Sequence, residues 1–311
     1  MDTPRVHPKA LRPGDTIGIV APAGPITSRE NLDQGIAMLE RIGFRVRFDN
    51  RIFESWRYLA GDDASRAAEL MRYFCDPEIQ GIVSLRGGFG CSRLIPRLDE
   101  GRLRSHCKIF MGFSDLTTLH LYFRRRFGWV TIHGPMATSP VLGKLAGTEQ
   151  EDNLVKVLTD ATYRPVFSFP QLETWHPGVG EGELAGGCLS LMIASLGTPY
   201  EIQTDGRILF LEDLGEPPYR IDRMLTQLRH AGKFENAQGI ILGSFRECEP
   251  APVGYSLEDT LMEVLRNLEL PILAKFPAGH GPENWAIPLG VPVRLDAGNR
   301  RIEFLEPAAS E

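Results

Sequence analysis

The segment 108–120, KIFMGFSDLTTLH, places a serine between a short apolar run and a helical pattern. A serine on a sharp strand-to-helix turn presents its hydroxyl above the sheet, and the next backbone N–H can stabilise an oxyanion. Ser114 is therefore a candidate nucleophile. The usual G-x-S-x-G pattern is incomplete, because Asp115 and Leu116 follow the serine, so Ser114 could also be the N-cap of an ordinary helix. This segment alone leaves both interpretations open.

Two later segments could supply the partners of a nucleophilic serine. Glu212 ends the apolar run ILFLE (208–212), where a carboxylate is costly unless something binds it. Asp213 and Glu216 are alternative acids, and the Glu212 carboxylate could also simply reach solvent. His280 lies between two glycines in a loop, an adjustable position for a general base. The order serine, acid, histidine is found in α/β-hydrolases, which permits a triad without proving one.

A glycine cluster follows another apolar run in the segment 84–95, SLRGGFGCSRLI. Glycines let backbone N–H groups approach a ligand closely, so this turn could hold an oxyanion or a carboxylate. It fits neither a dinucleotide motif nor a P-loop, and a plain tight turn is the alternative. Arg86 stands at the end of the run, where open α/β sheets bind ligands. It could clamp a carboxylate or hold a neighbouring acidic loop.

The five cysteines are an odd number without a C-x-x-C pair, which argues against a disulfide framework and a zinc site. Cys91 and Cys188 each adjoin a glycine-rich turn, so a thiol nucleophile remains an alternative. We expect no metal and no organic cofactor. The other histidines are weaker catalytic candidates than His280, and we expect His120 to pack on its helix. They are His7, His106, His120, His133, His176 and His230.

The chain has 311 residues and a formal net charge of -6, which leaves no basic face for nucleic acid. The run Arg124–Arg126 is interpreted as the solvated end of a helix, where cations complement the dipole. The first fifteen residues lack the apolar core of a secretory signal, and no window approaches twenty apolar residues. We therefore expect a cytoplasmic protein that does not bind membranes.

The elements that must position these residues alternate between short apolar runs and helical patterns, which predicts an α/β fold. A mainly parallel sheet flanked by helices is expected in an N-terminal domain, 1–165, and a second, smaller α/β domain in 181–311. The proline- and glycine-rich stretch 166–180 is the predicted linker. The predicted strands are 16–21, 44–48, 81–85, 108–112, 129–132, 207–212 and 239–243. The predicted helices are 28–42, 63–74, 116–127, 220–231 and 257–268.

Seven segments, taken together and in order, resemble the LD-carboxypeptidase family, which includes muramoyltetrapeptide carboxypeptidases and related microcin-immunity peptidases. The resemblance spans nearly the whole chain. The segments are GDTIGIVAPAGP (14–25), RGGFG (86–90), GFSD (112–115), HGP (133–135), GGCLSL (186–191), LEDLGEPPYRIDR (211–223) and GHGPENWAIPLG (279–290).

The resemblance implies a triad of Ser114 as nucleophile, Glu212 as acid and His280 as base, located at the interface of the two domains. It further implies that the backbone N–H groups of Gly88 and Asp115 form the oxyanion hole. This chain departs from the family at three positions. The departures are Phe89 and Phe113, where tyrosine is common, and Cys188, where asparagine is common. The cysteine leaves open which polar groups contact the substrate.

The function that the resemblance implies is that of a serine carboxypeptidase. It would hydrolyse the L,D-peptide bond that releases terminal D-alanine from cytoplasmic murein tetrapeptides, in peptidoglycan recycling. Arg86 is the candidate for binding the free carboxylate of the substrate, and the family commonly forms homodimers. One alternative is a peptidase of the same scaffold that cleaves microcin-like aminoacyl-nucleotides or other peptides and amides. Another is a two-domain protein that binds an anion without turnover.

Overall fold

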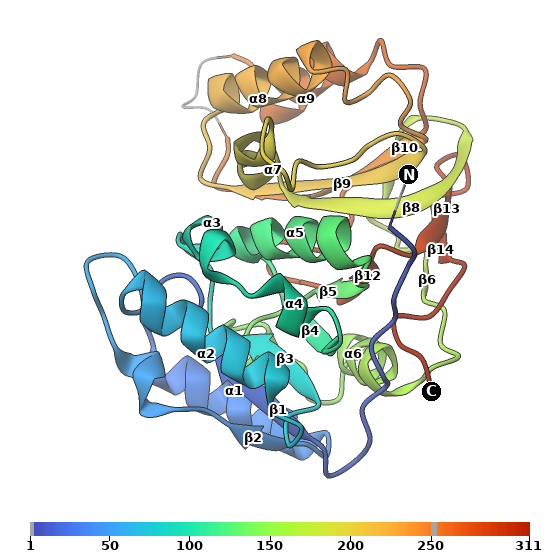
Figure 1. Ribbon diagram of the computed structural model, residues 1–311. Coiled ribbons are helices and arrows are strands. Elements are labelled where there is room, and N and C mark those ends of the chain that lie inside the picture. The colour runs from blue at the N-terminus through green and yellow to red at the C-terminus, as the bar shows by residue number, and fades with distance from the viewer. Residues whose placement is uncertain (1–2, 250–253) are drawn as a thin grey trace.

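The computed structural model describes residues 3–249 and 254–311 and holds two β-sheets with helices packed on them (Figure 1). The unit built from the first half of the chain lies below the unit built from the second half in this view, with α5 (Thr117–Phe127) between them. Residues 1–2 and 250–253, which fall within the two predicted domains, lie outside this description. The α/β class predicted from the sequence is confirmed.

The N-terminal sheet is mainly parallel, as predicted. Strands β1 to β5 run parallel to their neighbours, whereas β12, from the far end of the chain, pairs antiparallel with β5. Because helices cover both faces of this sheet, most of its strands are buried and apolar. In spatial order the strands are β12 (Ile287–Leu289), β5 (Thr131–His133), β4 (Ile109–Gly112), β3 (Gly81–Ser84), β1 (Thr16–Val20) and β2 (Arg45–Arg47).

The helices of the N-terminal unit bury apolar faces in two hydrophobic cores, one on each side of the sheet. Leu39 of α1 packs in one core and Phe74 of α2 in the other. The side chain of Ser28 caps α1 by accepting from a backbone N–H, as its residue type predicts. The remaining bounds are α1 (Arg29–Arg41), α2 (Asp63–Cys75), α3 (Cys91–Leu94), α4 (Glu100–Leu103), α6 (Glu149–Thr159), η1 (Asn50–Phe53), η2 (Ile95–Arg97), η3 (Ser114–Leu116) and η4 (Leu142–Lys144).

The C-terminal sheet has a parallel centre, β8 to β11, and antiparallel strands at both edges. Helices α7 (Leu189–Ser195), α8 (Pro218–His230) and α9 (Leu257–Leu265) bury their apolar residues against one face. In spatial order its strands are β6 (Val166–Phe167), β14 (Arg301–Phe304), β13 (Pro292–Asp296), β8 (Val179–Cys188), β9 (Arg207–Leu214), β10 (Gly239–Arg246), β11 (Ile272–Ala274) and β7 (Glu173–His176).

Several segments tie the two units together. Residues 166–180, the predicted linker, hold β6 and β7, which occupy the two ends of the C-terminal sheet. The segment around Lys9 lies beside the C-terminal end of the chain, since Lys9 and Ser310 form a β-bridge. Within the described ranges the C-terminal sheet has eight strands and the N-terminal sheet six. No helix in those ranges has the length and hydropathy needed to cross a membrane.

Arg124, at the end of α5, makes a further connection. The sequence predicts a solvated position for it, but its Nε and Nη2 donate to the Glu183 carboxylate of β8 at 2.8 and 2.5 Å. Both side chains are largely buried. The prediction is wrong for Arg124, which faces the second sheet, whereas Arg125 and Arg126 are exposed as predicted.

Candidate active site

Ser114 stands where the sequence predicts a sharp turn. Strand β4 ends at Gly112, Phe113 is extended, and Ser114 takes the left-handed conformation with φ of 63° at the start of η3, which leads into α5. A left-handed backbone is unfavourable for a residue with a Cβ and is often found at functional turns. No side-chain cap bond is present at the start of η3 or α5. Ser114 is therefore not the helix cap that the sequence left open.

The glycine-rich turn after β3 lies directly against Ser114. A Cβ added to Gly87 would lie 2.7 Å from Ser114 Oγ, so only glycine fits there. Gly88 has φ of 110° and is exposed. Within the described chain, the backbone N–H groups of Gly88 and Asp115 donate no hydrogen bond. These two free donors next to Ser114 could hold an oxyanion.

The Asp115 side chain fixes this turn to the serine turn. Its Oδ2 accepts a 2.8 Å hydrogen bond from the backbone N–H of Cys91, at the start of α3. The carboxyl group is fully buried, and burial raises its pKa. Arg86 Nη1 donates to the backbone carbonyl of Pro25 at 3.0 Å. Arg86 thus holds the loop after β1, and the rest of its guanidinium makes no hydrogen bond within the described residues.

Glu212 and His280 form a hydrogen-bonded pair. Glu212 lies on β9 with its side chain fully buried, and its Oε2 lies 2.6 Å from His280 Nδ1. The same oxygen accepts the backbone N–H of His280 at 3.1 Å. A Cβ added to Gly279 would lie 2.5 Å from this oxygen, and Gly279 has φ of 106°. The glycine before His280 therefore permits the close approach of the loop to Glu212.

The pKa values of both residues of the pair are shifted from their ordinary values. Burial by itself would raise the pKa of Glu212, but interactions with His133 and His280 outweigh it and lower this pKa to about 2. Burial favours neutral His280, yet the Glu212 carboxylate raises the pKa of His280 above its ordinary value. Glu212 is thus an anion near neutral pH, bonded to the imidazole of His280.

The fold gathers Ser114 and this pair at the interface of the two units. Thr117, on the helix that follows Ser114, accepts a 3.1 Å hydrogen bond from the backbone N–H of Cys188. Cys188 is the direct neighbour of Glu212 in the β8–β9 register. The Phe113 ring packs on the His280 ring at 4.8 Å between centroids. The serine and the imidazole are therefore neighbours, although no hydrogen bond joins them.

Comparisons with known proteins identify the family to which the chain belongs. Family models described as the LD-carboxypeptidase N-terminal domain and C-terminal domain match residues 17–134 and 181–295. The chain belongs to the LD-carboxypeptidase family. It is 38% identical to a probable murein peptide carboxypeptidase of Bacillus subtilis, over 98% of this chain and 95% of that protein. It is therefore a hydrolase of the serine-peptidase type.

Two solved structures of the family superpose on the chain. One is MccF in complex with glutamyl sulfamoyl guanosine, with a TM-score of 0.89 and 25% identity over 98% of this chain and 99% of that one. The other is a muramoyltetrapeptide carboxypeptidase from Oxalobacter formigenes, with a TM-score of 0.82 and 26% identity over 95% of this chain and 100% of that one. The two-unit fold is therefore the fold of the LD-carboxypeptidases.

The cysteines of this LD-carboxypeptidase are poorly suited to nucleophilic attack. Burial raises the pKa of both the Cys91 and Cys188 thiols well above the ordinary value, so both stay protonated. The Cys188 thiol lies 3.3 Å from Asp213 Oδ1 and donates to it, and Asp213 Oδ2 also accepts the backbone N–H of Ser190 at 2.8 Å. Asp213, the alternative acid, is therefore engaged away from His280. The described residues contain no cluster of three or more His, Cys, Asp or Glu that could hold a metal.

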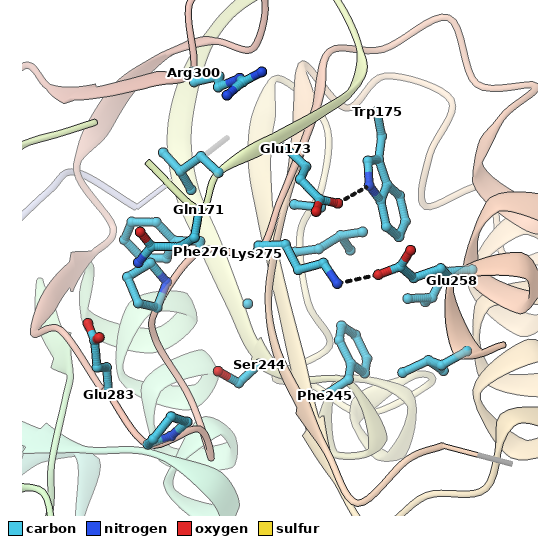
Figure 2. Close-up of a pocket in the computed structure, with 18 of the residues that line it drawn as sticks. Gln171, Glu173, Trp175, Ser244, Phe245, Glu258, Lys275, Phe276, Glu283 and Arg300 are labelled. Atoms are coloured by element: carbon cyan, nitrogen blue, oxygen red, sulfur yellow. Dashed lines mark hydrogen bonds and ion pairs between the residues drawn. The ribbon is translucent and has the colours of Figure 1, made fainter. Parts of the chain in front are cut away.

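Two hollows flank the loop that carries His280. One, of about 610 Å³, is lined by His280 and Phe113 together with Lys144 and Arg246. The other, of about 760 Å³, extends from Ser244 and Glu283 to Arg300 and contains the ion pair of Lys275 with Glu258 (Figure 2). Pro282 lines both hollows. The first is the better substrate site, because it contains the candidate base and the residue next to Ser114.

Proposed function

We propose that this LD-carboxypeptidase hydrolyses the L,D-peptide bond that joins terminal D-alanine to the preceding L-configured centre of a murein tetrapeptide. The observation that carries the proposal is the buried Glu212–His280 pair beside a serine held in a left-handed turn. The similarity to a probable murein peptide carboxypeptidase supports the choice of substrate. We assign Ser114 as nucleophile, His280 as base and Glu212 as the residue that orients His280.

The reaction begins when His280 Nε2 accepts the Ser114 hydroxyl proton as Oγ attacks the scissile carbonyl carbon. The carbonyl oxygen becomes an oxyanion, which the backbone N–H groups of Gly88 and Asp115 stabilise. His280 then gives its proton to the D-alanine nitrogen, the C–N bond breaks, and an ester to Ser114 remains. Water attacks this ester with His280 again as base, which releases the shortened peptide and restores Ser114.

Arg86 is our candidate for the free carboxylate of the substrate. One of its guanidinium nitrogens is held by the Pro25 carbonyl, and the remaining donors make no hydrogen bond within the described residues. A guanidinium binds a carboxylate with two parallel hydrogen bonds. The side chain comes directly before the glycine-rich turn that abuts Ser114. We further propose a homodimer that acts in the cytoplasm in peptidoglycan recycling, and light scattering on the purified protein tests the dimer.

The test is to incubate the protein with murein tetrapeptides that carry diaminopimelate or lysine and to measure loss of D-alanine by mass spectrometry. We expect release by the unmodified enzyme and none by Ser114→Ala. The control is Ser105→Ala, which changes an exposed serine that lines neither hollow. Turnover that survives Ser114→Ala would refute the assigned nucleophile. An unmodified protein that binds the peptides without cleaving them would support the anion-binding alternative.

A second candidate substrate is an aminoacyl sulfamoyl nucleoside. The specific observation in its favour is the TM-score of 0.89 to MccF in complex with glutamyl sulfamoyl guanosine. The same serine chemistry would cleave the bond between the aminoacyl group and the sulfamoyl nitrogen. Incubation with glutamyl sulfamoyl guanosine under the same conditions decides between the two, since the preferred substrate is the one with the higher kcat/KM.

A further inference from the structure

His133 and Glu212 each bury a polar atom that has no hydrogen-bond partner. His133 ends β5 with its side chain fully buried, and neither of its ring nitrogens is bonded. On β9, Glu212 Oε1 is also buried and unbonded, whereas Oε2 is bonded to His280. His133 Nε2 and Glu212 Oε1 lie 3.9 Å apart. Buried polar atoms are rarely left unpaired, so this juxtaposition calls for an explanation.

Aromatic rings form part of the surroundings of His133. Its ring packs against Phe113 at 5.7 Å and Phe210 at 5.0 Å between centroids. His120, the other buried histidine nearby, shows the contrast. Its two ring nitrogens lie 2.9 Å from Thr131 Oγ1 and 3.0 Å from the Gly112 carbonyl. His120 is thus a satisfied core histidine, whereas His133 makes no hydrogen bond within the described residues and lies beside the Glu212 carboxylate.

We propose that His133 is a positioning residue for the Glu212 carboxylate, with its Nε2–H directed at Oε1 while His280 occupies Oε2. The inference rests on the proposed function, in which Glu212 orients His280. Shortening the contact by roughly 1 Å would bring it into the normal hydrogen-bond range. The carboxylate, which belongs to β9 of the C-terminal sheet, is then held by His133 of the N-terminal sheet and by His280 of the loop between β11 and β12.

The neighbouring groups also decide which ring nitrogen of neutral His133 carries the proton. A proton on Nδ1 would be buried without an acceptor, which is costly. The neutral ring with its proton on Nε2 leaves only an unprotonated Nδ1 unpaired. We therefore assign the neutral Nε2–H tautomer. The titratable and charged groups near the pair come from several elements. They are His280 on its loop, Asp213 on β9, Cys188 on β8, Arg246 on β10 and His120 on α5. Asp213 is engaged by Cys188 and Ser190.

The consequence concerns the acid side of the pH profile. A carboxylate that loses a donor is more basic, so protons bind more readily to Glu212 and to His280. Either protonation abolishes the base function. Removal of the His133 donor should therefore move the acid limb of kcat/KM to higher pH. A loosened carboxylate also orients His280 less well, which lowers kcat without changing contacts to the substrate.

The variants that test this role are His133→Leu, which removes the donor, and His133→Gln, whose side-chain amide can place an N–H near the same position. We expect His133→Leu to lower kcat about 10- to 100-fold, the range for a lost hydrogen bond to a charged group. KM should stay within about twofold, and the acid limb should move up. His133→Gln should recover much of both. His120→Gln is the control for a lost buried histidine and should leave the acid limb in place.

Nitrogen NMR of protein labelled with 15N-histidine adds a reading that needs no substrate. It should show the Nε2–H tautomer of His133 and a higher pKa of His280 in His133→Leu. An Nδ1–H tautomer, or a His133→Leu protein whose acid limb and His280 titration match the unmodified enzyme, would overturn the inference. If the unmodified protein releases no D-alanine but His133→Leu still raises the pKa of His280, the proposed function fails and the positioning role stands.

Discussion

Glu212 Oε2 accepts both the backbone N–H of His280, at 3.1 Å, and the ring Nδ1–H, at 2.6 Å. Two bonds from one residue to one oxygen fix the imidazole relative to β9, although His280 belongs to a loop. The proton must sit on Nδ1, because a carboxylate can only accept. Nε2 of the neutral ring is then unprotonated, as a general base requires, so Glu212 determines the tautomer of His280.

The first prediction follows from this tautomer. In Glu212→Gln the amide can donate to Nδ1 and so favour the tautomer with the proton on Nε2, which cannot act as base. We expect kcat for D-alanine release to fall about 10⁴-fold, as in other triads that lose the acid. Thermal unfolding and circular dichroism should show that the variant is folded. A loss smaller than tenfold would argue that Glu212 is not the orienting acid.

The second prediction concerns pH. Burial by itself would lower the pKa of His280, but the Glu212 carboxylate outweighs it, so the net pKa is raised. A general base must be unprotonated, so kcat/KM should rise with pH through an apparent pKa above the ordinary histidine value of about 6.5. Activity should therefore be greatest at mildly alkaline pH. A profile that is flat from pH 5 to about pH 8 would contradict this assignment.

Local sequence patterns predict most of the N-terminal unit. The predicted helices 28–42 and 63–74 are observed as α1 and α2 with ends that differ by one residue. Helical periodicity and caps are encoded within each segment, so they can be read without the rest of the chain. Strands of two to four residues carry too little periodicity. The stretch 166–180 therefore reads as a linker, whereas β6 and β7 form there through pairing with distant strands.

For the same reason, the sequence predicts some parts of the site better than others. The strand-to-helix turn at Ser114 is visible in its own segment, but the choice between cap and nucleophile depends on contacts with residues distant in sequence. The sequence pattern predicts an exposed Arg124, whereas the structure largely buries its side chain in an ion pair with Glu183. The sequence makes His133 a weaker catalytic candidate than His280, although His133 begins the segment HGP that contributes to the family resemblance. Its contact with Glu212 joins two sheets and leaves no signal in local spacing.

The third prediction tests the packing of the glycine-rich turn on Ser114. In Gly87→Ala the new methyl group would lie 2.7 Å from both Cβ and Oγ of the serine, so the serine or the turn must move. We expect kcat to fall at least about 100-fold, because small displacements of a catalytic group are costly. Gly298→Ala is the control, since its methyl group meets nothing closer than 3.7 Å. Equal kcat in the two variants would refute the prediction.

The fourth prediction concerns the carboxyl group of Asp115. Asp115→Ala leaves the buried backbone N–H of Cys91 without its acceptor, which should lower the free energy of unfolding by about 1–3 kcal/mol. It also frees the glycine-rich turn from the serine turn, so kcat should fall. Asp115→Asn keeps an oxygen acceptor and should remain closer to the unmodified enzyme in both respects. Urea denaturation and D-alanine release measure the two effects, and an Asn variant as impaired as the Ala variant would contradict the role of the acceptor.

The last prediction separates the stability of the serine turn from its chemistry. Ser114 has φ of 63°, a conformation that costs about 1 kcal/mol or more for a residue with a Cβ and little for glycine. Ser114→Gly should therefore raise the free energy of unfolding by about 1 kcal/mol relative to Ser114→Ala. Both variants lack the hydroxyl and should be inactive, so the comparison isolates the backbone. If urea denaturation finds the glycine variant equal to or less stable than the alanine variant, the turn is not strained.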